Sequence, residues 1–307
     1  MQYTTPKLSL WQRFLQQKQL FLLLLPGLLF YIIFHYVPMG GLVIAFKDYG
    51  LWTGIWDSPW VGFEHFTRFF SSPDFLLLFK NTILLGFFTL LFSFPFPIIF
   101  ALLINELKSA KFRSISQTIS YLPSFLSVVV VCSMVIDMLS PQNGILTQIL
   151  SLFGIPPHYY VTDPQWFRPI YIISEIWKQT GFNAIIYVAA LSGIDPQLYE
   201  AAKMDGCSRI KSIWYVTLPG ILPTVATMFI IRSGDILRVG YEKVLLLYNP
   251  ATYEVADIFA TFVYRQGIMQ QNYSYASAVG IFESLAALTI VIVANTVSKK
   301  LSQNSLW

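Results

Sequence analysis

Long apolar segments separated by polar loops run along the whole chain. A helix needs roughly 20 apolar residues to cross about 30 Å of hydrocarbon. Six segments approach that length, at about 19–38, 77–104, 115–139, 169–191, 213–236 and 276–297. The pattern predicts an all-α polytopic membrane protein with six transmembrane helices. It has a membrane domain at 19–297, a tail at 1–18 and a tail at 298–307.

The composition supports this class. Hydrophobic residues make up 55% of the chain and charged residues 12%, whereas about a quarter of a soluble chain is charged. Lysine and arginine cluster on both tails, on the loop after the second span and on the central loop, and they are sparser on the other loops. Because positive charge is retained inside the cell, both termini and the central loop are predicted to be cytoplasmic.

The first outer loop, 39–76, is rich in aromatic residues. Phenylalanines recur at helical spacing from Phe63 to Phe70, after Trp52, Trp56 and Trp60. This pattern predicts a helix lying in the outer headgroup layer, where aromatic rings are favoured. Docking of an external protein would explain it too.

Several predicted spans contain proline, which removes a helical hydrogen bond and bends the axis. These are Pro95 and Pro97 in the second span, Pro123 in the third, and Pro219 and Pro223 in the fifth. Bent spans suit a transporter that opens and closes a path, although packing alone also produces them.

Polar side chains recur inside the predicted spans, where they are costly unless they face the bundle or a water-filled cavity. In the fourth span they occupy one helical face. The candidates for a substrate path are Glu175, Lys178, Gln179, Asn183, Arg232, Asp235 and Glu283. The alternative is structural, with Glu175–Lys178 and Arg232–Asp235 as helix-to-helix ion pairs or as snorkelling helix ends.

The central loop at 193–212 predicts two short helices. Asp195 can cap the first helix and Pro196 suits its first turn. Gly206 is a natural stop because glycine readily adopts the left-handed conformation that ends many helices. Ser208 can cap the second helix. The loop is therefore an ordered element between two apolar spans.

Glu200-Ala201-Ala202, Gly206, Val216 and Leu218-Pro219 reproduce a known spacing. This stretch resembles the EAA loop of permease subunits of ABC importers, with Val216 in place of isoleucine. The resemblance implies the type I ABC importer permease fold. It also implies that the loop contacts an ATPase subunit through Glu200, Ala201, Ala202, Asp205 and Gly206.

Other segments are similar to sugar-importer permeases, among them 61–66, 101–105, 247–250 and 264–267. The last two look like the LplB-type subgroup, which takes up oligosaccharides and polysaccharide fragments. The resemblance implies a bacterial cytoplasmic membrane protein that works with a second homologous permease, two ATPase subunits or domains, and an extracytoplasmic solute-binding protein. The loop at 240–275 is a candidate dock for that binding protein. Membrane lipid and a glycan substrate complete the expected partners, and no nucleic acid is expected.

The chain lacks a phosphate-binding loop of the G-x-x-x-x-G-K-[ST] type. We therefore expect no cofactor in this chain, with ATP and Mg bound by the partner ATPase subunit, and no enzymatic activity of its own. Its histidines are isolated and its two cysteines show no metal-ligand spacing. Three alternatives stay open: an ion-coupled secondary transporter, a membrane-embedded hydrolase or glycosyltransferase, and an ABC importer permease for a non-sugar cargo.

Overall fold

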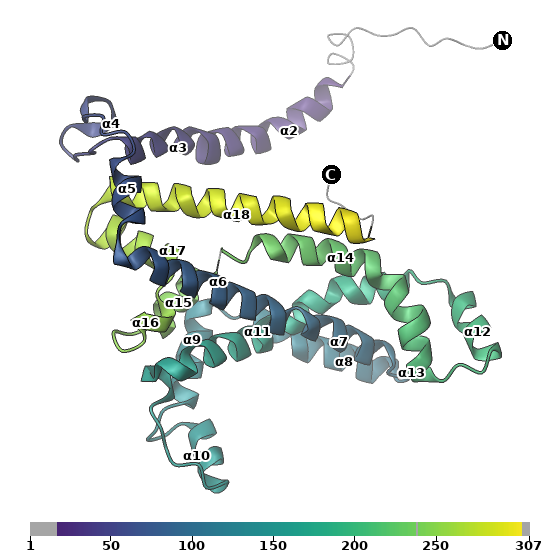
Figure 1. The fold of residues 1–307 in the computed structure, drawn as a ribbon. Coiled ribbons are helices and arrows are strands. Elements are labelled where there is room, and N and C mark those ends of the chain that lie inside the picture. Colours follow the sequence, from purple (N-terminus) through teal and green to yellow (C-terminus); the bar gives the residue numbers. More distant parts are fainter. Residues whose placement is uncertain (1–16, 238, 303–307) are drawn as a thin grey trace, which may run out of the picture.

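The computed structural model describes residues 17–237 and 239–302, and its regular structure is helical apart from one isolated bridge between Lys47 and Trp60. The predicted all-α fold is confirmed. Long helices run side by side across the molecule (Figure 1). They are α6 (Pro73–Ser93), α7 (Pro95–Asn105), α11 (Pro164–Ser192), α14 (Leu218–Gly234) and α18 (Tyr273–Ser302).

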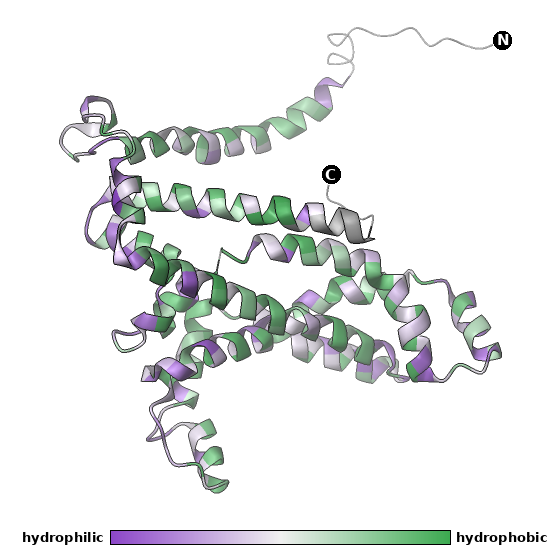
Figure 2. Cartoon of the chain, in the orientation of Figure 1, coloured by the Kyte–Doolittle hydropathy of each residue, from purple (hydrophilic) through white to green (hydrophobic). Residues whose placement is uncertain are grey.

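Four helical segments are long and apolar enough to cross a membrane: Lys18–Phe46, Pro73–Asn105, Arg209–Gly234 and Tyr273–Val293. They match the first, second, fifth and sixth predicted spans. Figure 2 shows hydrophobic residues concentrated along these helices and hydrophilic residues at the turns between them. The prolines of the second span lie in α7, which begins at Pro95 directly after α6.

The third predicted span is two helices that meet at an angle of 99°. The first is α8 (Ala110–Tyr121), which continues through the 3₁₀ turn η3 (Leu122–Phe125). The second is α9 (Val128–Met138). Pro123 lies in the 3₁₀ turn, and the Ser127 side chain accepts a hydrogen bond from the Val130 amide and so caps α9. The bend predicted from Pro123 is present, and it is sharp enough to divide the span.

The fourth predicted span corresponds to α11, which crosses the centre of the molecule. Its 29 residues exceed the length that a transmembrane helix needs. It is more polar than the other spans and lies outside the set of strongly apolar segments. A helix can remain polar at membrane depth when protein rather than lipid surrounds it, and α11 packs against α6, α7, α8 and α14.

The N-terminal helical segment lies apart from the rest of the bundle (Figure 1). It comprises α2 (Lys18–Tyr31), the π-helix η1 (Ile32–Tyr36), α3 (Val37–Met39) and the 3₁₀ helix η2 (Gly40–Phe46). No residue of α2, η1 or α3 is buried. Contact with the bundle begins at η2, which packs on α18. The apolar side chains of α2 therefore need lipid or another protein around them.

Short helices cover one end of the bundle, at the left of Figure 1. They are α4 (Gly54–Asp57), α5 (Glu64–Phe70), α10 (Ile145–Leu152), η4 (Tyr160–Thr162), α15 (Tyr241–Leu247), α16 (Tyr253–Ala256), α17 (Phe259–Tyr264) and η6 (Arg265–Met269). The opposite end carries α12 (Pro196–Met204) and α13 (Arg209–Ser212), followed by the π-helix η5 (Ile213–Thr217). All segments that the charge pattern assigns to the outer side thus lie at one end.

The aromatic residues of the first outer loop divide into two groups. Phe69 on α5 is fully buried, in a cluster with Phe259, Phe262 and Tyr275. The prediction that this face of the helix meets the lipid headgroups is therefore wrong for Phe69. The spacing of the phenylalanines identifies an apolar face of the helix, but it does not show whether lipid or protein covers that face. The tryptophans are exposed: Trp52 by 101%, Trp56 by 89% and Trp60 by 66%.

Buried polar groups attach the outer helices to the long ones. The Asn81 side chain on α6 donates to the backbone oxygens of Glu254 and Asp257 over 3.0 and 3.1 Å and accepts from Arg168 over 3.0 Å. Arg265 forms a bidentate pair with Asp257. This hydrogen-bonded carboxylate raises the pKa of the Arg265 guanidinium above its ordinary value.

Candidate functional site

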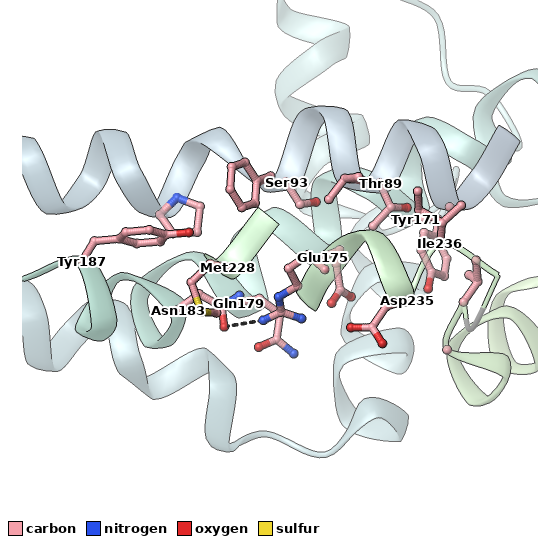
Figure 3. A pocket seen from close by; sticks show the side chains of 17 residues that line it. Thr89, Ser93, Tyr171, Glu175, Gln179, Asn183, Tyr187, Met228, Asp235 and Ile236 are labelled. Atoms are coloured by element: carbon pink, nitrogen blue, oxygen red, sulfur yellow. Dashed lines mark hydrogen bonds between the residues drawn. The ribbon is translucent and has the colours of Figure 1, made fainter. Parts of the chain in front are cut away.

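A cavity of about 220 Å³ opens between α6 and α7 on one side and α11 and α14 on the other (Figure 3). Thr89 and Ser93 of α6 contribute hydroxyl groups, and Met228 and Arg232 line it from α14. The segment after α14 closes one side with Asp235 and Gly240. We call this space the central cavity. Its lining mixes polar and apolar groups at the core of a bundle whose outer surface is hydrophobic.

One stripe of α11 forms a wall of the central cavity. Tyr171, Glu175, Gln179, Asn183 and Tyr187 recur at every fourth position, and all five line it (Figure 3). Residues four apart lie above one another on a helix. The sequence predicted Glu175, Lys178, Gln179 and Asn183 on a shared face, and the structure places all of these except Lys178 along this cavity wall. The two tyrosines extend the same spacing in both directions and were missed.

Arg232 is held by an amide rather than by a carboxylate. Its guanidinium donates to Oδ1 of Asn183 over 2.9 Å (dashed in Figure 3). Asp235 lines the same cavity, but its carboxylate is not among the ion-pair partners found in the described residues. The Arg232–Asp235 pair that helical spacing allowed is not formed, because the Arg232 guanidinium is directed to Asn183 on α11 instead.

Glu175 pairs with a residue far away in the sequence. Lys243 Nζ on α15 donates to Glu175 Oε2 over 2.8 Å and to the Tyr171 backbone oxygen over 2.9 Å. The lysine side chain is 6% exposed. The structural alternative supposed that Glu175 pairs with Lys178. The partner of Glu175 is Lys243 instead. Lys243 gave no signal in the sequence, because it lies in an outer loop that only the folded chain brings against α11.

Lys178 and Glu283 do not line the central cavity. Lys178 borders a second cavity of about 290 Å³ between α9, α11 and the segment 240–243. Glu283 is half-buried on α18 and lines neither cavity. Of the seven candidate path residues, five thus line the central cavity, Lys178 lines only the second cavity, and Glu283 lines neither.

The central loop folds as its local sequence predicts. Asp195 accepts a hydrogen bond from the Gln197 amide over 2.9 Å and caps α12. Gly206 ends that helix with a φ of +74°, and the Ser208 side chain caps α13. The Tyr199 hydroxyl lies 3.2 Å from that of Thr217, so α12 is tied to η5.

The five residues expected to contact an ATPase subunit all lie on α12 or its C-terminal turn. Ala202 is half-buried, and the other four are exposed to solvent: Glu200, Ala201, Asp205 and Gly206. Apolar side chains accompany them, with Leu198 53% and Met204 88% exposed. The helix therefore presents small, charged and apolar groups on a surface that the rest of the described chain leaves open.

The available chemistry is that of binding. In the described part of the chain, no three histidine, cysteine, aspartate or glutamate side chains lie close enough to hold a metal ion. The buried hydrogen-bonding groups of the central cavity can instead hold hydroxyl groups or a carboxylate, and its tyrosines can contact the apolar face of a sugar ring.

Comparison with known proteins agrees with this reading. Residues 93–304 match the family model of the binding-protein-dependent transport system inner membrane component. The chain is 43% identical to the polygalacturonan/rhamnogalacturonan transport system permease protein YteP of Bacillus subtilis (strain 168), over 96% of this chain and 92% of that protein. It is 42% identical to Protein LplB of the same organism, over 95% and 92%.

A solved structure is similar over nearly the whole chain. It is a permease chain from the crystal structure of a bacterial alginate ABC transporter in complex with an alginate pentasaccharide-bound periplasmic protein. The TM-score is 0.89 at 44% identity, with 97% of this chain and 99% of that chain covered. At this identity and coverage, the likeness extends to the arrangement of the helices as well as to the sequence.

Proposed function

The chain belongs to the family of binding-protein-dependent transport system inner membrane components, and from this premise we propose that it is the permease subunit of an ATP-driven importer for acidic oligosaccharides. Members of the family are inner membrane components, so the chain is a multi-pass protein of the cytoplasmic membrane. In our proposal all six predicted spans cross it, with both termini cytoplasmic.

The cargo assignment rests on the relatives and on the central cavity. Polygalacturonan and alginate are both polymers of uronic acids, which carry a carboxylate on each sugar. The central cavity offers Arg232 for such a carboxylate and Asn183, Gln179 and Ser93 for hydroxyl groups. Arginine suits a carboxylate because its donors match both oxygens. The observation that carries the proposal is this polar cavity within a fold shared with an alginate transporter.

The cavity size supports an alternating-access mechanism. Pockets for small ligands occupy roughly 300–1,000 Å³, and the central cavity holds about 220 Å³. An oligosaccharide needs more room, so the helices around the cavity have to separate for the cargo to pass. The α14 helix contains Pro223 and follows a π-helical turn, and interruptions of this kind are sites where helices bend.

We propose that α12 contacts an ATPase subunit and transmits its closure to the bundle. The helix has few contacts of its own, yet its ends are fixed by Asp195, Gly206 and the Tyr199–Thr217 hydrogen bond. A rigid helix tied to η5, directly ahead of α14, can move α14 when it is pushed. ATP and Mg are bound by the partner in this scheme.

The remaining partners follow the same scheme. A second homologous permease and surrounding lipid would cover the apolar side chains of α2, which the single chain leaves exposed. An external solute-binding protein would dock on the outer helices, where residues 240–275 are rich in tyrosine. That protein would deliver the glycan to the central cavity.

The test is ATP hydrolysis by the assembled complex, reconstituted with its second permease, ATPase subunits and binding protein, using galacturonate and mannuronate trisaccharides. The proposal predicts that loaded binding protein stimulates hydrolysis. It also predicts that Gly206→Pro abolishes the stimulation while the complex still assembles, because proline cannot adopt the positive φ of Gly206. Glu200→Ala should weaken it. Failure of any ATPase subunit to associate would refute the proposal.

A further inference from the structure

The second cavity lies beside the central cavity and shares a wall with it. The shared residues are Tyr171, Glu175, Gln179 and Gly240. Val128 and Val131 of α9 form the apolar far side, and Lys178 and Lys243 contribute charge. Its volume of about 290 Å³ is just below the roughly 300–1,000 Å³ that small-ligand pockets occupy. It has room for one sugar unit rather than for a chain.

The ammonium groups of Lys178 and Lys243 and the carboxylate of Glu175 all line this cavity. The Glu175 carboxylate is already paired with Lys243 over 2.8 Å. Lys178 is 8% exposed, and within the described chain its ammonium has no hydrogen bond or ion pair. Glu242 also lines the cavity, but it is exposed to solvent and not within ion-pair distance of Lys178. Lys178, Lys243 and Glu175 together therefore carry one uncompensated positive charge.

An unpaired charge at this depth is costly. An ammonium without a protein partner inside a cavity loses part of its hydration, and the positive charge of Lys178 also repels that of Lys243. Folding alone would favour an apolar residue at this position, beside Val128 and Val131. Ionisable residues inside membrane helices that lack a structural partner are by default functional. An anion in the cavity would supply the missing partner.

We propose that the second cavity is a carboxylate subsite, in which Lys178 binds a uronate carboxylate of the transported glycan. The inference rests on the proposed function and adds a second contact to the glycan. This contact lies across the wall formed by Glu175 and Gln179, on the side opposite Arg232. Lysine acts here as a compact point charge that its flexible stem can direct. Gln179 borders both cavities and can bind hydroxyl groups on either side.

The experiment compares uptake of trigalacturonate by vesicles that contain the complete complex, with the parent chain, Lys178→Met, Lys178→Arg and the control Lys80→Met. Lys80 is exposed on α6 and lines neither cavity. The loss of one charged hydrogen bond should lower uptake at low substrate roughly 10- to 100-fold in Lys178→Met. The effect should fall mainly on the KM for uptake. Lys178→Arg should retain most of the parent rate, and Lys80→Met all of it.

Thermal unfolding of the same complexes separates binding from a structural role. Removal of an unpaired buried charge should leave the Tm of Lys178→Met unchanged or raise it. The inference is overturned if Lys178→Met imports trigalacturonate like the parent, or if both Lys178 variants lose uptake together with a lowered Tm. In either case the proposed function survives as long as the parent complex imports the sugar. If the parent imports none, the proposed function and this subsite both fail.

Discussion

Lys243 and Glu175 lie 68 positions apart in the sequence and form an ion pair over 2.8 Å. The pair joins the outer helix α15 to the central helix α11, in the wall that the two cavities share. It thereby couples the outer end of the molecule to the predicted path. A movement of the outer helices, for example on docking of another protein, would act directly on this wall.

Breaking this pair should destabilise the protein. Lys243→Met leaves the Glu175 carboxylate, which is 24% exposed, without its charged partner, and the expected loss is about 1.5 to 3 kcal/mol. Lys243→Met should therefore lower the free energy of unfolding more than Lys243→Met combined with Glu175→Leu. Denaturant unfolding of the purified complex in detergent measures both. Glu175→Leu alone completes the cycle, and losses in the two single variants that add up to the loss in the double variant would show that the pair has no coupling energy.

Gly86 allows α6 to approach the segment after α14. A Cβ atom at this position would lie 1.9 Å from the backbone oxygen of Ile236. Gly86→Ala should thus destabilise the fold by about 1 to 3 kcal/mol through overpacking. Gly280→Ala is the matched control, since its Cβ would meet nothing within 4 Å and alanine favours a helix. Relative to the parent, the thermal midpoint should fall in Gly86→Ala and rise in Gly280→Ala.

Asn81 connects α6 to the outer helices through three hydrogen bonds. Asn81→Ala leaves the guanidinium of Arg168 and the backbone oxygens of Glu254 and Asp257 without this partner. The expected loss is about 1 to 3 kcal/mol, with faster amide hydrogen exchange across α16 and α17. Asn143→Ala on an exposed outer turn should change neither. Unchanged exchange in Asn81→Ala would contradict this role.

Asn183 orients Arg232 in the central cavity. Asn183→Ala should reduce glycan uptake roughly 10- to 100-fold, because a lost hydrogen bond to a charged group corresponds to about 1.5 to 3 kcal/mol. Assembly and basal ATP hydrolysis should stay at the parent level. Normal uptake by Asn183→Ala would show that the bond to Arg232 has no part in transport.

Local chemistry made part of this structure predictable. The helix starts at Asp195 and Ser208 and the stop at Gly206 depend on neighbouring residues alone, and each is found in the structure. The polar face of α11 follows from helical periodicity, which is also set by local backbone geometry. The first, second, fifth and sixth spans could be predicted because each is a long apolar run, which a membrane-spanning helix requires.

What the sequence could not provide depends on contacts between distant segments. Lys243 is an ordinary loop lysine until α15 packs against α11. The 99° bend at η3 is sharper than Pro123 alone requires. The burial of Phe69 depends on Phe259 and Phe262, which lie far along the chain. In each case the local pattern indicates a polar or apolar face, and only the packing decides which partner meets it.

The central claim is that ATP hydrolysis by a partner drives glycan import through this chain. The most direct test is uptake of labelled trigalacturonate into vesicles that contain the complete complex and its binding protein, with an ionophore that dissipates all ion gradients. In these vesicles the lumen corresponds to the cytoplasm. Our account predicts that uptake requires ATP in the lumen and persists with the ionophore. It also predicts that Gly206→Pro abolishes uptake. Uptake that proceeds without ATP and stops with the ionophore would contradict it and identify an ion-coupled transporter.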